Sequence, residues 1–258
     1  MLLIVTRPLA QATAWVHQLQ ALGTRAQALP LIEIAPVADT AAVIGAWQGL
    51  GASDLAMFVS ANAVTQFFAL RPAALAWPEA TLAAATGPGT SAALRAAGVP
   101  AHQIVEPPAS EGAFDSEALW LRLRHRDWQG RRARIVRGED GRNWLADQLQ
   151  ARGAMVEFVA AYRRLPPLLD SAATALLQHA LEQPQSHLWL FSSSQAVAHL
   201  GALAPGADWS RSHALASHPR IAQAARALGL VQVGDVAPDP AAVAQRAAAW
   251  PSIQSAAQ

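Results

Sequence analysis

Residues 58–64 read Phe-Val-Ser-Ala-Asn-Ala-Val, and residues 191–197 read Phe-Ser-Ser-Ser-Gln-Ala-Val. In both segments an apolar run ends at a turn that contains serine, and a helical pattern begins directly after it. This arrangement is typical of the junction between a buried strand and the next helix in a parallel α/β sheet. The two segments therefore predict one such junction in each half of the chain.

Further matches at the same distance indicate an internal repeat. Residues 18–23, Gln-Leu-Gln-Ala-Leu-Gly, match residues 148–153, Gln-Leu-Gln-Ala-Arg-Gly, and this alignment pairs Arg7 with Arg137. Residues 94–98 correspond to residues 225–229 in the same way. All these pairs keep their order and are separated by about 130 residues, which indicates an old duplication. We therefore expect two similar domains.

Apolar runs alternate with amphipathic stretches along the chain. We expect strands at Leu2–Thr6, Ala26–Ile34, Leu55–Ser60, Leu82–Thr86, Gln103–Glu106, Ala133–Arg137, Met155–Arg163, His187–Phe191, His213–Ser217 and Leu230–Val233. Several of the helical stretches between them end at a glycine, the residue common just past a helix C-terminus. Strands that alternate with helices predict parallel sheets. Ten strands are too many for one compact domain of this length, so we expect an α/β fold with two five-stranded sheets.

The composition excludes several classes of protein. The chain has 258 residues, 52% of them hydrophobic and 14% charged, which is enough to fill a core. A formal net charge of +1 leaves no basic excess for a nucleic-acid backbone. The absence of cysteine excludes disulfides, thiolate metal sites and cysteine nucleophiles. Since no apolar stretch reaches membrane-spanning length and Met1–Val5 is too short for a signal peptide, we expect a cytoplasmic protein.

Five turns, each after a predicted strand and before a helix, are the candidate binding sites. They are Ser60-Ala61-Asn62-Ala63, Thr86-Gly87-Pro88-Gly89-Thr90, Gly138-Glu139-Asp140-Gly141-Arg142, Ser192-Ser193-Ser194-Gln195 and Ser217-His218-Pro219-Arg220. Ligands of parallel sheets bind beyond the C-terminal ends of the strands, where helix N-termini favour carboxylates and phosphates. Helix capping alone explains any one turn. Five together favour a site for a polyanion, to which Arg7, Arg137, Arg142 and Arg220 would add two-point contacts.

The sequence shows little catalytic machinery. The eight histidines have no metal-ligand spacing, so we expect no metal. The acidic residues do not pair as in a glycosidase, and Asp115-Ser116-Glu117 is explained as the start of a helix. The Gly87-Pro88-Gly89 turn lacks the spacing of a dinucleotide fingerprint.

Taken in order, the motifs resemble the uroporphyrinogen-III synthase family. They are Ile4-Val5-Thr6-Arg7-Pro8, Leu29-Pro30-Leu31-Ile32-Glu33, Ser60-Ala61-Asn62-Ala63-Val64, Thr86-Gly87-Pro88-Gly89-Thr90, Asp115-Ser116-Glu117, Val136-Arg137-Gly138 with Gly141-Arg142, and Tyr162-Arg163-Arg164. The resemblance implies two flavodoxin-like domains joined by a two-stranded linker. Domain 1 would hold residues 1–36 and 166–258, and domain 2 residues 37–165, with linker strands near 31–37 and 160–166. Each half of the repeat would then lend its opening βαβ unit to the other domain.

The resemblance also implies a reaction, that of a cyclising hydro-lyase. Hydroxymethylbilane, a linear tetrapyrrole with eight carboxylates, would lose its terminal hydroxyl as water and close into uroporphyrinogen III, with inversion of ring D and without a cofactor. Such an enzyme acts largely by holding the two reacting ends of the substrate close together and correctly oriented, which suits a protein with anion sites and no catalytic triad. We expect a monomer. The alternatives are a two-domain, hinge-closing binding protein for a small anion and a nucleotide-sugar transferase.

Tyr162, the only tyrosine, is the candidate catalytic residue. It lies at the end of a predicted strand, and Arg163 and Arg164 beside it would orient the phenol or stabilise its anion. A phenol aimed at the leaving hydroxyl would act as a general acid, and the resemblance points to the same position. The alternative is that Tyr162 packs the linker with its ring inward and its hydroxyl in water.

The residues expected to bind substrate come from the strand-end turns. They are Arg7, Ser60, Ala61, Asn62, Thr86, Gly87, Gly89, Thr90, Arg137, Gly138, Arg142, Ser192, Ser193, Ser217, His218 and Arg220. One turn departs from the family pattern. Many relatives read Gly-Pro-Thr-Thr where this chain reads His218-Pro219-Arg220-Ile221, so a threonine hydroxyl role there is lost or moves to Ser217.

Overall fold

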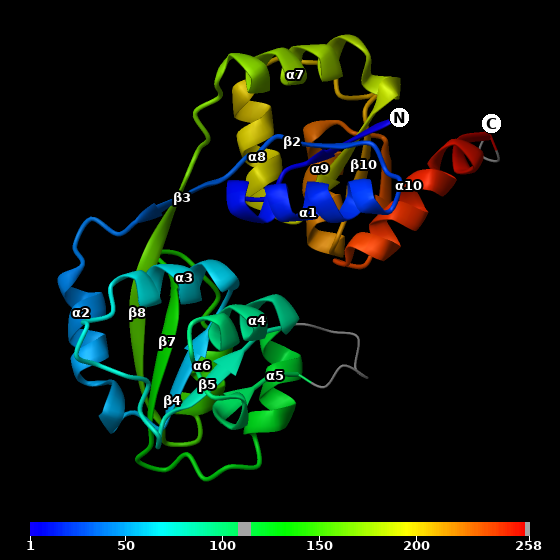
Figure 1. Cartoon of the computed structure of the whole chain (residues 1–258). Helices are drawn as coiled ribbons and strands as arrows, with labels where there is room; N and C mark the ends of the chain where they lie inside the picture. Colours follow the sequence, from blue (N-terminus) through cyan, green and yellow to red (C-terminus); the bar gives the residue numbers. More distant parts are fainter. Residues whose placement is uncertain (108–114, 256–258) are drawn as a thin grey trace. The chain divides into compact units, whose positions relative to one another are not determined.

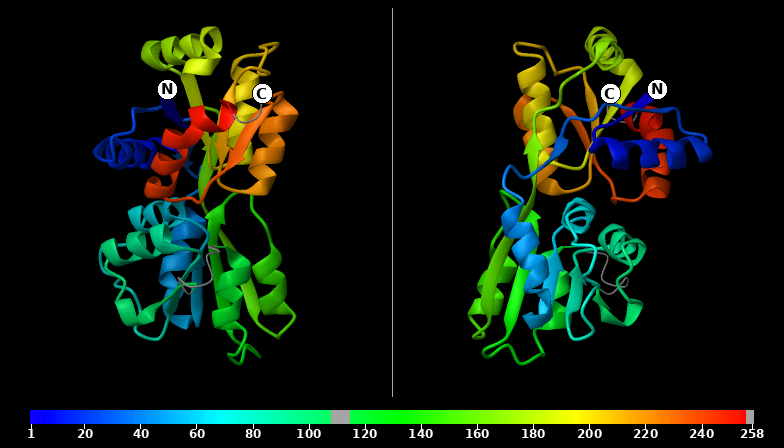
Figure 2. Two further views of the ribbon diagram at one scale, coloured as in Figure 1. Left: turned by 90° about the vertical axis from the view of Figure 1, so that its right-hand side faces the viewer. Right: turned by 60° about the vertical axis from the view of Figure 1, so that its left-hand side comes forward.

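The computed structural model describes residues 1–107 and 115–255 (Figure 1). Residues 108–114 of the predicted second domain and residues 256–258 at the end of the predicted first domain lie outside the described residues. The chain divides into two compact units, Met1–Glu33 with Leu165–Gln258, and Ile34–Arg164. We call them unit 1 and unit 2. Each contains one sheet, flanked by helices on both faces (Figure 2).

Unit 1 contains a parallel sheet of five strands. Their order is β2 (Ala26–Ala28), β1 (Leu2–Val5), β9 (His187–Phe191), β10 (His213–Ala216) and β11 (Gln232–Asp235). The helices are α1 (Leu9–Ala21), α7 (Ser171–Glu182), α8 (Ser194–Leu203), α9 (Pro219–Leu228) and α10 (Pro240–Ser255). Every residue of β9 and β10 is buried, as expected for central strands covered on both faces. The helices pack in pairs, α1 with α10 and α8 with α9.

Unit 2 contains a sheet of six strands. Their order is β3 (Glu33–Pro36), β8 (Met155–Leu165), β7 (Arg132–Gly138), β4 (Leu55–Phe58), β5 (Leu82–Ala85) and β6 (Ile104–Val105). The helices are α2 (Ala41–Gln48), α3 (Ala61–Ala69), α4 (Pro88–Ala96), α5 (Ser116–Leu123) and α6 (Trp144–Gln150). Successive residues of β4 belong to different cores. Leu55 and Met57 pack with α5 and α6, whereas Ala56 and Phe58 pack with α2, α3 and α4.

The expectation of two five-stranded sheets is wrong for unit 2, whose sheet has a sixth strand. The predicted strand Ala26–Ile34 is two strands, since β2 ends at Ala28 and β3 begins at Glu33. Pro30 lies between them, and a proline has no N–H with which to continue a strand ladder. The chain thus leaves one sheet and joins the edge of the other beside β8. Both boundaries between the units fall within or at the ends of β3 and β8.

The sheet orders agree with an exchanged duplication. Apart from β3, the strands run β2-β1-β9-β10-β11 in unit 1 and β8-β7-β4-β5-β6 in unit 2. Numbered along each repeat, both sheets have the flavodoxin-like order 2-1-3-4-5. The opening unit β1–α1–β2 completes the sheet formed by the second half, and β7–α6–β8 completes the sheet formed by the first half.

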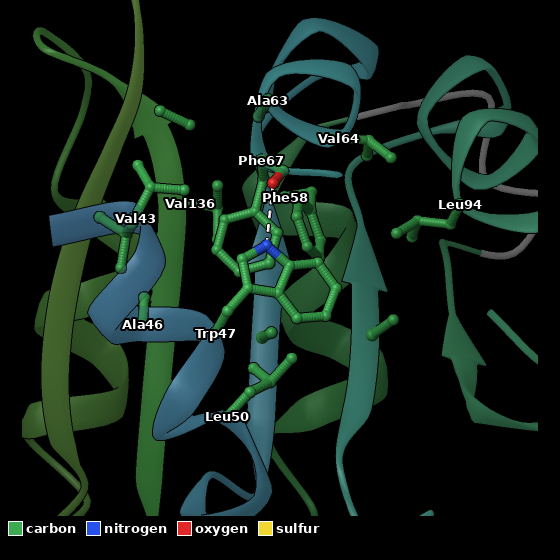
Figure 3. Packing of buried hydrophobic residues seen from close by; sticks show 14 of the residues in the cluster. Val43, Ala46, Trp47, Leu50, Phe58, Ala63, Val64, Phe67, Leu94 and Val136 are labelled. Carbon is green, nitrogen blue, oxygen red and sulfur yellow. Dashed lines mark hydrogen bonds between the residues drawn. The ribbon is translucent and has the colours of Figure 1, made fainter. Parts of the chain in front are cut away.

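An aromatic cluster anchors α3, the helix that carries one of the predicted turns. The ring of Trp47 stacks on Phe67, with centroids 4.6 Å apart, and its indole N–H donates to the Phe67 carbonyl at 2.8 Å (Figure 3). Phe58 meets Phe67 edge to face. Because Phe58 ends β4 and Phe67 lies in α3, this packing holds the turn between strand and helix in place.

Candidate functional site

The sheet order identifies one crevice in each unit. Chain connections leave the first and third strands of a 2-1-3-4-5 sheet in opposite directions, so a ligand site lies at the C-terminal ends of those strands. In unit 1 these strands are β1 and β9, and in unit 2 they are β7 and β4. At the end of β1, the Thr6 hydroxyl donates to the Leu190 carbonyl of β9 at 2.7 Å. The five predicted turns follow β4, β5, β7, β9 and β10.

Tyr162 lies in the core of unit 2, with its ring inward and its side chain fully buried. Its neighbour on β7 is Gly138, where the strand register shifts. A Cβ atom on Gly138 would lie 3.2 Å from two ring carbons of Tyr162, so glycine accommodates the phenol in this position without a displacement of the ring or the strand. The Glu139 N–H donates to the Tyr162 carbonyl at 3.1 Å and holds the two strands together beside the ring.

The Tyr162 hydroxyl is part of a chain of hydrogen bonds. Nη2 of Arg164 donates to Oη of Tyr162 at 3.0 Å, and Oη lies 3.3 Å from Oγ of Ser60. Ser60 is partly exposed and is the N-cap of α3, where its Oγ accepts the Ala63 N–H at 3.2 Å. The phenol therefore contacts no solvent, and the chain from its oxygen leads to a serine at the strand-end turn.

The remaining predicted residues near β4 and β5 lie at the starts of α3 and α4. Thr86 donates its hydroxyl to the Val59 carbonyl at 3.2 Å and ties the ends of the two strands together. Gly87 is the N-cap of α4 and has no side chain, so the N-cap residue offers no capping oxygen to the first turn of this helix. The other residues are Ala61 and Asn62 in the first turn of α3, and Gly89 and Thr90 in the first turn of α4.

Arg137 and Arg142 are each held by groups of unit 2. Nη1 of Arg137 donates to Oδ1 of Asn143 at 2.7 Å, and its guanidinium lies 4.1 Å from the centroid of the Phe158 ring. Arg142 forms an ion pair with Glu117 in the first turn of α5. A substrate carboxylate that binds either arginine would share the guanidinium with these partner side chains or displace them.

Arg7 lies between β1 and α1 in unit 1. Its guanidinium stacks 4.1 Å over the Trp15 ring, and Nη1 donates to Oε1 of Gln11 at 3.4 Å. Among the described residues, its buried Nε has no hydrogen-bond partner. Burial lowers the pKa of Arg7 to about 10, which still leaves it charged at neutral pH. Arg7 therefore provides a partly buried cation beyond the C-terminal end of β1.

Two of the unit 1 turns cap their own helices. Ser193, which follows Ser192 at the end of β9, is the N-cap of α8 and accepts the Gln195 N–H at 3.2 Å. His218 is the N-cap of α9, and its Nδ1 accepts the Arg220 N–H at 3.1 Å. An accepting Nδ1 places the proton of a neutral imidazole on Nε2.

At the turn that differs from the family pattern, the helix is thus capped by His218 and not by Ser217, which directly precedes it. The Arg220 carbonyl accepts the Ser194 hydroxyl at 3.4 Å and links the starts of α8 and α9. Among the described residues, no group pairs with the Arg220 guanidinium, which is exposed at the strand-end turn.

Comparison with known proteins places this arrangement in a family. A family model described as "Uroporphyrinogen-III synthase HemD" matches residues 13–243. The uroporphyrinogen-III synthases of Escherichia coli K12 and Salmonella typhimurium LT2 are each 32% identical to this chain, over 238 and 236 residues. Each alignment covers 89% of this chain and 92% of the relative. The chain belongs to the uroporphyrinogen-III synthase family.

Solved structures of other uroporphyrinogen-III synthases share the fold. A mutant synthase from Thermus thermophilus aligns with a TM-score of 0.61 at 21% identity, over 98% of this chain and 99% of that one. The synthase from Helicobacter pylori 26695 aligns with a TM-score of 0.56 at 14% identity, over 97% and 100% of the two chains. The predicted family and the α/β fold with two mostly parallel sheets are therefore confirmed, with six strands in the second sheet.

Sequence analysis of this synthase-family chain missed several partners of the predicted residues. Gln11 and Trp15 follow Arg7 at helical spacing on α1, so their contacts with Arg7 have a local sequence signal. The pairing of Glu117 with Arg142 joins α5 to the turn before α6 and has no such signal, because it depends on how the helices pack. The same holds for the contact between Gly138 and the Tyr162 ring.

Proposed function

We propose that this chain catalyses the reaction of its family, the closure of hydroxymethylbilane to uroporphyrinogen III with loss of water and inversion of ring D. The match of the synthase family model to residues 13–243 carries this proposal. The relatives at 32% identity over 89% of the chain support it. The fold supports it too, because each unit has strand-end turns with helix N-termini suited to carboxylates.

Recognition of the eight substrate carboxylates is distributed over both sets of turns. The proposed contacts are Arg7, Ser60, Ala61, Asn62, Thr86, Gly87, Gly89, Thr90, Arg137, Gly138, Arg142, Ser192, Ser193, Ser217, His218 and Arg220. With so many donors, replacing one arginine weakens binding modestly. Arg142→Ala should cost about 1–3 kcal/mol, the range for one charged hydrogen bond. Complete loss of binding in this variant would contradict a distributed site.

Tyr162 is the proposed source of the proton that turns the leaving hydroxyl into water. Its Oη accepts a hydrogen bond from Arg164 and lies beside Ser60 at the strand-end turn. In Tyr162→Phe, turnover should fall by at least about tenfold while the product remains the inverted isomer, because geometry sets the regiochemistry. Wild-type turnover in this variant would reduce Tyr162 to a packing residue.

We further propose the cofactor requirement, oligomeric state, location and domain bounds of the protein. The enzyme works without a cofactor, as a monomer in the cytoplasm. Domain 1 comprises residues 1–36 and 166–258, and domain 2 comprises residues 37–165. Within the described part of the chain, no helix has the length and apolar character needed to cross a membrane.

A product assay tests the function. The purified protein is incubated with hydroxymethylbilane, the product is oxidised, and the porphyrin isomers are separated, with heat-denatured protein as control. Uncatalysed closure gives the uninverted isomer, so the active enzyme should shift the product to type III. An isomer ratio equal to that of the control would overturn the synthase proposal and favour a non-catalytic binding protein for small anions.

A further inference from the structure

Burial keeps the Tyr162 hydroxyl away from any ligand in the described conformation. Its side chain is 0% exposed and packs within the core of unit 2. A general acid must come within about 2.6–3.2 Å of the atom that it protonates, or act through an intermediary. Of the two hydrogen-bond neighbours of the phenol, Arg164 is exposed and Ser60 is partly exposed. Only Ser60 carries a hydroxyl, and it lies just beyond the C-terminal end of β4.

The donor and acceptor capacities of the three side chains fix the direction of the hydrogen bonds in the chain Arg164–Tyr162–Ser60. A guanidinium only donates, so Oη of Tyr162 accepts from Arg164. If Ser60 also donated to Oη, the buried phenol proton would have no acceptor within residues 1–107 and 115–255, which costs about 1–3 kcal/mol. The phenol therefore donates to Oγ of Ser60. Oγ then accepts two bonds, from Tyr162 and from the Ala63 N–H, and its own hydrogen has no acceptor among the described residues.

We propose that Ser60 is the group that delivers the proton to the leaving hydroxyl, and that Tyr162 resupplies Ser60. This inference rests on the proposed synthase function. The C–O bond of the terminal hydroxymethyl group breaks with its electron pair on oxygen. Ser60 gives its hydroxyl proton to that oxygen, which departs as water, and takes the phenol proton of Tyr162. When the free α-carbon of ring D forms the last bond of the macrocycle, it loses its hydrogen as a proton, which returns through Ser60 to the phenolate.

Two features of unit 2 favour this transfer. The Arg164 guanidinium stays hydrogen-bonded to Oη and offsets the negative charge that develops on the phenol oxygen. Ser60 is the N-cap of the nine-residue helix α3, where the positive end of the helix dipole stabilises the negative charge that develops on Oγ as its proton leaves. The distance of 3.3 Å between Oη and Oγ is long for an O–H···O bond, as is common for catalytic bonds before substrate binds. Arg164 is thus a positioning residue.

Four variants test the relay by single-turnover and steady-state kinetics. Ser60→Ala and Tyr162→Phe should each lower kcat by at least about tenfold with KM nearly unchanged, because the backbone donors for carboxylates remain. In the double variant, kcat should be no lower than in the slower single variant. Both substitutions interrupt the same proton relay, so the second causes no further loss. Ser60→Thr, which keeps the hydroxyl, should restore most of the activity.

Controls separate loss of the proton from loss of the helix cap. Ser60→Asn keeps a side-chain oxygen for the Ala63 N–H but has no hydroxyl, so it should be as slow as Ser60→Ala even where it is the more stable protein. Asp170 is the corresponding N-cap of α7, and its Oδ1 accepts the Ala173 N–H at 2.8 Å. Asp170→Ala removes this cap. It should lose a similar amount of stability and keep wild-type kcat.

The outcomes distinguish the relay from the function itself. Wild-type kcat in Ser60→Ala or Ser60→Asn, together with a slow Tyr162→Phe, would show that the phenol donates directly and would overturn the relay. Effects that multiply in the double variant would also overturn it. In both cases the wild-type protein would still produce the type III isomer. Failure of the wild-type protein to change the isomer ratio would instead remove the proposed function.

Discussion

The contact between Gly138 and Tyr162 makes Gly138→Ala an informative perturbation. The added Cβ would lie 3.2 Å from Cε2 and Cζ of the ring, whereas carbon atoms prefer about 3.5–4.0 Å. The ring or β7 must therefore move by about 0.3–0.8 Å. The ring is enclosed in the unit 2 core and cannot move freely, so the substitution should cost about 1–3 kcal/mol, the usual range for overpacking.

Urea unfolding followed by tryptophan fluorescence measures this cost as a lower midpoint. Gly141→Ala is the matched control, because its Cβ would meet only the flexible Arg137 side chain, at 3.5 Å. The shift should also disturb the 3.3 Å contact between Tyr162 and Ser60, so kcat should fall along with stability. Gly138→Ala with the midpoint and kcat of the wild type would refute the inference that the ring is held against β7.

Three further changes should alter stability in defined directions. Gly45→Ala should stabilise by about 0.4–1 kcal/mol in urea unfolding, because Gly45 lies in α2 and its Cβ would meet nothing within 4 Å; a lower midpoint would contradict this. Trp47→Phe should cost about 1–3 kcal/mol by the same measurement, since it removes the buried indole bond to Phe67, and an unchanged midpoint would exclude a contribution from that bond. Burial lowers the pKa of His187 and of His213, so these two side chains bind fewer protons in the folded chain than in the unfolded chain below about pH 6.5. Their contribution to the free energy of unfolding is complete above about pH 6.5 and should be lost toward pH 5; His187→Gln should flatten that slope, and equal slopes in the two proteins would rule His187 out.

Most of the fold was predictable because it depends on short-range patterns. Buried strands such as β4 and β9 are continuous apolar runs that end at serine turns, and the repeat offset revealed two similar sheets. The sixth strand was missed because the four residues between β2 and β3, Leu29–Ile32, are apolar and Pro30 is their one sign of a break. Whether such a stretch stays in one sheet or crosses to another is decided by distant partners, here β8.

The candidate site was predictable at the level of the turns but not of their partners. N-capping by Ser60, Ser193 and Asp115 follows from residue type and position at the end of a strand or loop. The environment of Tyr162 did not follow, because it depends on Gly138 and on a shift in the register between β7 and β8. Sequence analysis left open whether the hydroxyl faces water, and the structure places it against Arg164 and Ser60.

The exchange of βαβ units between the two sheets has a consequence for biosynthesis. Unit 2 is continuous in sequence, so it can fold as soon as Arg164 has left the ribosome. β1 must wait for β9, and the Thr6–Leu190 bond closes a separation of 184 residues. At about 5–20 residues per second, this delay is on the order of ten seconds or more. Throughout it, β1, α1 and β2 are held without their sheet, which makes the newly made N-terminus the segment most dependent on chaperone protection.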